Sequence, residues 1–187
     1  MNGLTVEVDN TDAEGRLILS DALTYISRTY KPHTLIDIAT LTGAIIVALG
    51  NTYSGAFVED ESLWQELKAA GEAEHDRFWR MPLDDEYLKL IDGFNADLRN
   101  TGKPAGSCTA AIFLKQFVEG LEDREKLVEG SNEGRPTVRY AHLDIAGAAS
   151  ADRPTPYQDK GMYTGRPVRA LVEFARRFAV LHATPPQ

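Results

Sequence analysis

The chain has 187 residues, 43% of them hydrophobic and 26% charged, and these ordinary proportions exclude a disordered or collagen-like protein. Its formal net charge of -8 argues against a nucleic-acid-binding surface and leaves room for bound cations. A single cysteine, Cys108, excludes an intramolecular disulfide framework and favours a reducing compartment, which we take to be the cytoplasm. No apolar run approaches membrane-spanning length, so we expect no membrane partner.

Strand and helix patterns alternate through the first half of the chain. Apolar and polar residues alternate over residues 4–8, which predicts a strand with one polar face. After a turn-like stretch, apolar side chains recur at helical spacing until Pro32 blocks continuation. The segments 34–40 and 54–58 are short and apolar, which predicts two strands. Ser62 is placed to cap a helix that carries Leu63, Leu67 and Ala70 on one side.

Helices, loops and a polar stretch follow in the second half. We expect a helix over residues 84–91, and Ser107 is placed to cap another helix that runs through Phe117. Residues 119–136 are polar and show no core pattern. We expect them to form an exposed, flexible insertion without a catalytic role.

The last elements complete the alternation. Residues 138–145 predict a strand, and residues 164–182 predict a closing helix with Pro167 in its first turn, where a missing amide is harmless. Strands that alternate with helices are typical of an α/β sandwich. We therefore expect residues 1–187 to belong to one α/β unit.

Carboxylates crowd the first strand and the turn after it. Glu7, Asp9, Asp12 and Glu14 lie within eight residues, and Arg16 follows at once. Crowded carboxylates repel one another unless a cation or an arginine lies among them, and the turn after a strand is where open α/β sheets bind ligands. This pattern suggests a metal site. Composition alone favours the alternative of a solvated turn whose carboxylates complement the dipole of the next helix.

The octapeptide NTDAEGRL, residues 10–17, is identical to the signature of the leucine aminopeptidase (cytosol aminopeptidase) family. Further segments resemble that family in the same order: DIATLTGA, WRMPL, AHLDIAG and TGRPV. The resemblance spans most of the chain and implies the carboxy-terminal part of the catalytic domain. It also implies a three-layer α/β/α sandwich with a mixed central sheet, incomplete at its amino-terminal side.

The resemblance implies a two-metal hydrolase that removes residues such as leucine from peptides with a free amino terminus. Two divalent ions, zinc or manganese, would be held in part by Asp12 and Glu14. Arg16 would hold a bicarbonate that relays a proton from the metal-bound water. A guanidinium suits that role because it stays charged and presents a planar fork to a planar anion.

Further positions acquire substrate roles from the same resemblance. Backbone groups of Thr40, Leu41 and Gly43 would hold the peptide. The pocket for its first side chain would be lined by Asn10, Ala13, Ala146 and Ala149. Without the family, a strand end with a tight glycine turn would be the preferred interpretation of residues 40–43.

Other metal ligands of the family lie in motifs that these 187 residues do not contain, one similar to KGITFDTGG and one similar to MKxDMxGA. We therefore expect the chain, as a fragment without those ligands, to be inactive alone. Two alternatives remain. The chain could be a non-catalytic assembly module that joins the hexamer typical of the family, or it could bind nucleic acid, which its acidic balance argues against.

Overall fold

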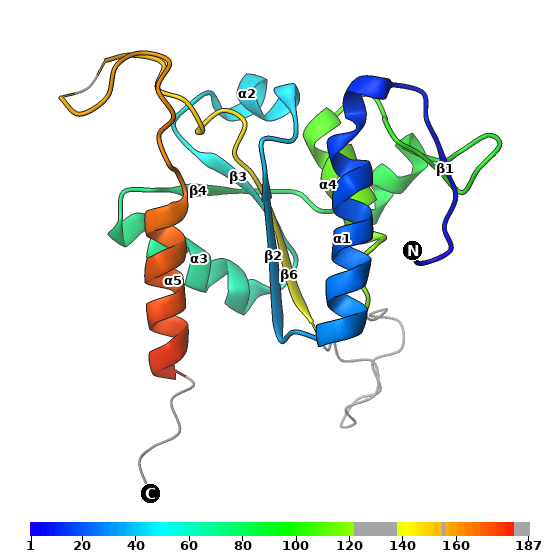
Figure 1. Cartoon of the computed structure of the whole chain (residues 1–187), viewed down its shortest axis with the longest axis horizontal. Coiled ribbons are helices and arrows are strands. Elements are labelled where there is room, and N and C mark those ends of the chain that lie inside the picture. Colours follow the sequence, from blue (N-terminus) through cyan, green and yellow to red (C-terminus); the bar gives the residue numbers. More distant parts are fainter. Residues whose placement is uncertain (122–137, 155, 182–187) are drawn as a thin grey trace, which may run out of the picture.

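A computed structural model of the chain describes residues 1–121, 138–154 and 156–181 (Figure 1). Its main sheet has four strands in the order β2-β6-β3-β4, namely β2 (Thr34–Ala39), β6 (Arg139–Asp144), β3 (Ser54–Val58) and β4 (Phe78–Met81). The β2–β6 and β3–β4 pairs are parallel, whereas β6 and β3 are antiparallel. The sheet is therefore mixed, as expected from the family resemblance.

In the part of the chain that the structure describes, five α-helices and two short 3-10 helices accompany the strands. The α-helices are α1 (Gly15–Tyr30), α2 (Gly43–Leu49), α3 (Glu61–Ala73), α4 (Gly106–Lys115) and α5 (Val168–Leu181). The 3-10 helices are η1 (Thr11–Ala13) and η2 (Asp85–Leu90). A second, two-stranded sheet pairs β1 (Val6–Glu7) in parallel with β5 (Leu98–Arg99).

The two faces of the main sheet bury different helices. On one face, Ala141 and Leu143 of β6 pack in a core with Leu63 and Leu67 of α3 and with Ala170 of α5. The alternate side chains of β6 point the other way, because neighbouring residues of a strand face opposite sides of the sheet.

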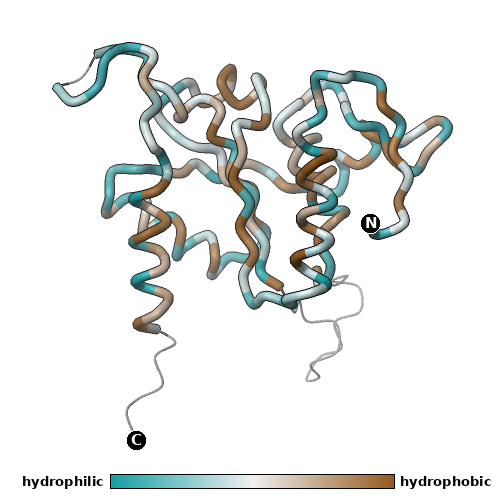
Figure 2. The backbone as a smooth tube through the Cα atoms, in the orientation of Figure 1, coloured by the Kyte–Doolittle hydropathy of each residue, from teal (hydrophilic) through white to brown (hydrophobic). Residues whose placement is uncertain are grey.

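The opposite face carries a second core. Tyr140 of β6 packs there with Leu23 of α1 and with Ile112 and Phe113 of α4. Figure 1 accordingly shows α3 and α5 on one side of β2 and β6, with α1 and α4 on the other. Apolar and polar stretches alternate along α1 and α5 in Figure 2, as expected for helices with one face toward a sheet. The α/β/α layering is confirmed.

The predicted helix starts were partly wrong. Asp60 caps α3, because its side chain accepts the Leu63 amide at 2.7 Å, and Ser62 instead donates its hydroxyl to Asp60. Helix α4 begins at Gly106 after Ala105 in a left-handed conformation, so Ser107 lies inside the helix and caps nothing. The first error arose because several polar residues near a helix start do not specify which one adopts the extended cap geometry. The second arose because no side chain caps α4 at all.

Other boundaries also differ from the predictions. The first strand is limited to Val6–Glu7, because its only partner is the two-residue β5. The helix predicted over residues 84–91 is the 3-10 helix η2, and the last helix begins at Val168, after Pro167. Before it, the Arg166 side chain bonds to Asp76, which holds this segment in a loop. Strands β4 and β5 were not predicted, and of the predicted insertion, residues 122–136 lie outside the described residues.

Strand β2 forms an edge of the main sheet. The carbonyls of His33 and Ala39 accept amides from the β6 side, so the odd-numbered residues of β2 direct their backbone groups toward β6. Thr34, Ile36 and Ile38 therefore direct theirs outward, and no strand in the described part of the chain pairs with them. Figure 1 looks onto this edge, which is a template for pairing with another strand.

Across the same described residues, no helix has the length and apolar character needed to span a membrane.

Candidate metal and substrate site

The signature octapeptide folds as a capped turn that runs into α1. Asn10 caps η1 by accepting the Asp12 amide at 2.9 Å, and Glu14 is the residue before the first turn of α1. The side chains of Asp12 and Glu14 are exposed. Within the described residues, neither carboxylate forms an ion pair or accepts a hydrogen bond. Both are therefore available as ligands.

The donor type fits a divalent metal, but the donor number does not complete a site. Carboxylate oxygens are good ligands for zinc and manganese, which need four or more donors. No group of three or more potential ligands among His, Cys, Asp and Glu occurs in the described residues. His142 is buried and bonds through Nδ1 to Asp37 at 2.7 Å. A complete metal site that included Asp12 and Glu14 would therefore need further ligands, which the described residues do not group with them.

Arg16 is a buried cation that lacks direct partners. Only 7% of the residue is exposed, and its Nε and Nη1 atoms are buried without a hydrogen-bond partner in the described part of the chain. Burial lowers the pKa of the guanidinium, and the negative charge of Asp144 opposes this shift. Buried donors normally have acceptors, so the two atoms suit an anion that brings its own oxygens.

Asp144, at the end of β6, organises the segment that follows β2. Its carboxylate accepts the Leu41 amide at 3.1 Å, the Thr42 hydroxyl at 2.6 Å and the Ala146 amide at 3.2 Å. Thr42 in turn caps α2 by accepting the Ile45 amide. The negative charge of Asp144 also acts on the Arg16 guanidinium in α1. Asp144 therefore interacts with both α1 and residues 40–43.

Several of the predicted substrate residues lie near the carboxyl ends of the strands β2 and β6. Thr40 and Gly43 are exposed at the end of β2, and Leu41 lies close to Gly15, where an added Cβ would be 3.4 Å from Leu41 Cδ1. In Figure 1, the ends of β2 and β6 lie beside the starts of α1 and α2. Parallel strands place their carboxyl ends together in this way, which is where α/β folds bind ligands.

The remaining predicted positions lie on the loop after β6 and in the signature turn. Ala146 is half-buried, and its amide donates to Asp144. Ala149 lies further along, where its carbonyl accepts the Thr164 amide at 2.9 Å. Asn10 and Ala13 lie in the signature turn beside Asp12. No described contact joins Ala149 to that turn, so its place in a side-chain pocket stays a prediction.

Two residues outside the predicted set shape this site. These residues are Asp144 and Asn100. Asn100 is buried and hydrogen-bonds to the backbone of Asp9, Asn10 and Ala13. The only sequence signal for either residue is a polar side chain beside a strand end, and many residues share that signal.

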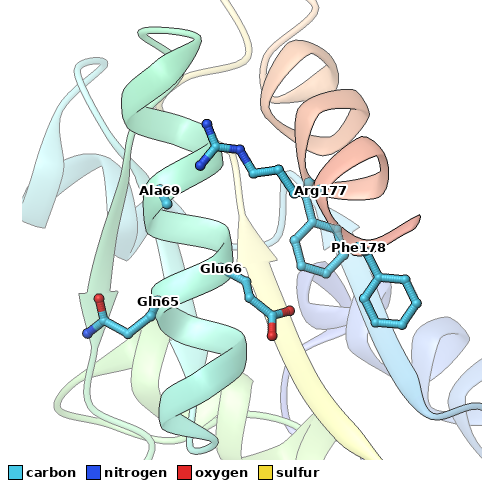
Figure 3. Close-up of a pocket in the computed structure, with 6 residues that line it drawn as sticks. Gln65, Glu66, Ala69, Arg177 and Phe178 are labelled. Atoms are coloured by element: carbon cyan, nitrogen blue, oxygen red, sulfur yellow. The ribbon is translucent and has the colours of Figure 1, made fainter. Parts of the chain in front are cut away.

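A cleft of about 280 Å³ lies elsewhere, between α3 and α5 (Figure 3). It is lined by Gln65, Glu66, Ala69, Phe174, Arg177 and Phe178. Its charged groups already have partners, because Glu66 bonds to Arg139 and Arg177 bonds to Glu173. The cleft is on the outer helical layer and carries none of the predicted site residues.

Comparison with known proteins identifies the family of the chain. A family model described as the cytosol aminopeptidase family, catalytic domain, matches residues 1–172. The cytosol aminopeptidase of Dictyostelium discoideum is 49% identical over 178 residues, which cover 94% of this chain and 31% of that protein. A probable cytosol aminopeptidase of Chelativorans is 47% identical, with coverage of 91% and 31%.

Solved structures give the same result. A tomato leucine aminopeptidase mutant superposes with a TM-score of 0.79 at 41% identity, covering 94% of this chain and 30% of that one. The bottromycin maturation enzyme BotP in complex with Mn superposes with a TM-score of 0.80 at 35% identity, covering 96% and 36%.

The fold and the carboxylate-bearing turn are thus those of a family of peptidases. The chain belongs to the cytosol aminopeptidase family, and it matches part of the catalytic domain. It spans about a third of the length of the curated relatives it matches.

Proposed function

We propose that this chain supplies part of the active site of a two-metal aminopeptidase that removes amino-terminal residues, such as leucine, from peptides. The observation that carries the proposal is the state of the signature turn. Among the described residues, the exposed Asp12 and Glu14 carboxylates have no partner, and the buried Arg16 has two unpartnered nitrogens. A buried cation without acceptors is costly in a purely structural turn, and it is useful where an anionic ligand binds.

Asp12 and Glu14 are the proposed metal ligands. Zinc and manganese both accept carboxylate oxygen, and a related enzyme has been solved with Mn. When bound, a pair of such ions captures the free α-amino group, polarises the scissile carbonyl and supplies the attacking hydroxide. A peptide with a blocked amino terminus should accordingly be a poor substrate.

Arg16 is the proposed catalytic residue, and bicarbonate is its proposed partner. Its position in the first turn of α1 places the guanidinium two residues after Glu14. The unpartnered Nε and Nη1 atoms are buried donors, and an anion held at the guanidinium would supply acceptor oxygens to it. The negative charge of Asp144 favours the charged form of the guanidinium, and a bicarbonate held there would supply a group that can accept and release a proton.

Substrate binding is assigned to the two loops that Asp144 connects. Backbone groups of Thr40, Leu41 and Gly43 would bind the peptide backbone. These groups can hold a fixed position because Asp144 holds the amides of Leu41 and Thr42. The side-chain pocket is assigned to Asn10, Ala13, Ala146 and Ala149.

The chain by itself is proposed to have little activity. Two carboxylates leave a metal with too few protein donors, and the other ligand motifs of the family do not occur in these 187 residues. Complete sites would therefore require further aminopeptidase sequence, within a homo-oligomer such as a hexamer. Cytoplasmic location is proposed from the names of the relatives and from the free, buried Cys108.

A second candidate is a non-catalytic assembly module, and the outer edge of β2 favours it. The backbone groups of Thr34, Ile36 and Ile38 there have no strand partner in the described part of the chain. Such an edge suits strand pairing with another chain. The two candidates differ in whether metal binding depends on the signature turn.

The test is a pair of titrations on the chain. Mn²⁺ binding is followed by electron paramagnetic resonance, and hydrolysis of leucine p-nitroanilide is assayed with added Zn²⁺ or Mn²⁺, with N-acetyl-leucine p-nitroanilide as the control substrate. We expect weak Mn²⁺ binding that Asp12→Asn and Glu14→Gln each reduce, and little hydrolysis. Binding unchanged by both substitutions would overturn the metal assignment and favour the assembly module. Hydrolysis lost in Asp12→Asn would show that the chain completes the site by itself.

A further inference from the structure

Asn100 is fully buried directly after β5, and its side chain serves a single segment. Its Oδ1 atom accepts the amides of Asp9 at 3.0 Å and Asn10 at 3.3 Å. Its Nδ2 atom donates to the carbonyls of Asn10 at 2.6 Å and Ala13 at 3.4 Å. A buried amide has two donor and two acceptor positions, and all of them are directed at the turn that precedes α1.

That turn has few other tertiary anchors. Strand β1 ends at Glu7, and the side chain of Asn10 bonds only locally, to the amide of Asp12. The carboxylates of Asp12 and Glu14 have no partner in the described residues. The backbone on either side of Asp12 is therefore held largely by the contacts of Asn100, and Glu14 follows at the start of α1.

Asn100 is itself held in place from the same region. The backbone amide of Asn100 donates to the Glu7 carbonyl at 2.9 Å, and β5 pairs with β1 just before Asn100. The Arg99 side chain also lies 3.7 Å from the Asp9 carboxylate. Residues 98–100 thus form a fixed support for a turn that lies about ninety residues earlier in the sequence.

We propose that Asn100 is a positioning residue for divalent-cation binding, which holds the backbone of residues 9–13 so that Asp12 and Glu14 present their carboxylates in one arrangement. This inference rests on the proposed function. An amide is required because only an amide both accepts from two N–H groups and donates to two carbonyls at this position. Residues that orient metal ligands are commonly worth about 10- to 100-fold in metal affinity.

Asn100→Asp is the informative substitution because it is nearly isosteric and separates accepting from donating. Its new carboxylate can accept from Asp9 and Asn10, but it cannot donate and would face the carbonyls of Asn10 and Ala13. Burial and those carbonyls would raise the pKa of the new carboxyl group. Once protonated, the group donates again, so the variant should recover as the pH falls.

The measurement is the apparent Mn²⁺ affinity of the whole chain at pH 8 and pH 6, with each variant compared with wild type at the same pH. We expect Asn100→Asp to bind about tenfold more weakly at pH 8 and to regain most of this loss at pH 6. The matched control is Thr24→Val, which removes another fully buried side chain that donates to a backbone carbonyl, that of Phe117. The control should lower thermal stability while leaving Mn²⁺ affinity within about twofold.

Amide hydrogen exchange at residues 9–14 without metal gives an independent measurement. We expect exchange in Asn100→Asp at pH 8 to be faster than in the Thr24→Val control. At pH 6, after correction for intrinsic rates, exchange in Asn100→Asp should slow to the range of that control. Wild-type exchange and wild-type affinity in the variant at both pH values would overturn the positioning role. A loss of affinity equal to that of Thr24→Val would also overturn it. If Asp12→Asn leaves wild-type Mn²⁺ binding unchanged, the proposed function fails, and the exchange data still decide whether Asn100 holds the turn.

Discussion

Removing the carboxylate of Asp144 should destabilise the fold strongly, because this buried group accepts hydrogen bonds from the loops that follow β2 and β6. It is 1% exposed and accepts bonds from the Leu41 amide, the Thr42 amide and hydroxyl, and the Ala146 amide. Asp144→Ala leaves these donors without an acceptor and Arg16 without a nearby negative charge. Breaking such a buried charged network typically costs about 3 to 5 kcal/mol.

The substitution Asp144→Asn separates charge from hydrogen bonding. An asparagine oxygen can still accept the amides of Leu41 and Ala146, while its NH₂ group can donate to the Thr42 hydroxyl. Only the negative charge opposite Arg16 is lost, so we expect a smaller destabilisation of about 1 to 2 kcal/mol. The remaining effect should be a higher affinity of Arg16 for anions, because repulsion from Asp144 has been removed.

Urea unfolding followed by circular dichroism measures both free energies, and thermal scans provide a second estimate. For a chain of this size, 1 kcal/mol corresponds to about 2 to 4 °C, so Asp144→Ala should lower Tm by roughly 6 to 20 °C. A loss below about 1 kcal/mol for Asp144→Ala would refute the network as the support of residues 40–43. Equal losses for the Ala and Asn variants would instead show that the charge, and not the bonds, holds these loops.

Three further predictions concern the scaffold. Asp60→Ala should cost about 1 kcal/mol at pH 7 in urea unfolding, because the cap of α3 is lost. Burial raises the pKa of Asp60, but hydrogen bonds from Ser62 and Leu63 outweigh it and hold the pKa below the usual 3.8, so this difference should shrink as the pH falls below that value. Gly147→Ala should lower Tm or abolish folding, since a Cβ would lie 2.0 Å from the Gly50 carbonyl oxygen; an unchanged Tm would contradict the close approach. Ile38→Lys, at the outer edge of β2, should reduce self-association in light scattering, and unchanged association would place the interface elsewhere.

Local patterns were sufficient for much of this protein. The alternation of short apolar runs with helical spacing predicted β2, β3 and β6 and the helices α1, α3, α4 and α5, because periodicity reflects which face of an element is buried. Helix α2 was not predicted. The octapeptide at residues 10–17 identified the family and the turn, since its residue types are contiguous in the chain. The carboxylates and Arg16 could therefore be named without any knowledge of the fold.

Only the tertiary structure decided how that turn is held. Asn100 lies 90 residues from Asn10, and Asp144 lies 103 residues from Leu41, so no spacing rule connects them. Strands β4 and β5 were missed because short segments are defined by their partners more than by their own residues. The cap of α3 was misplaced for a related reason, since several polar residues compete there and the backbone geometry selects one. Residue types thus determined which chemistry is available, while burial and long-range hydrogen bonds, which depend on the packed chain, determined where each group is held.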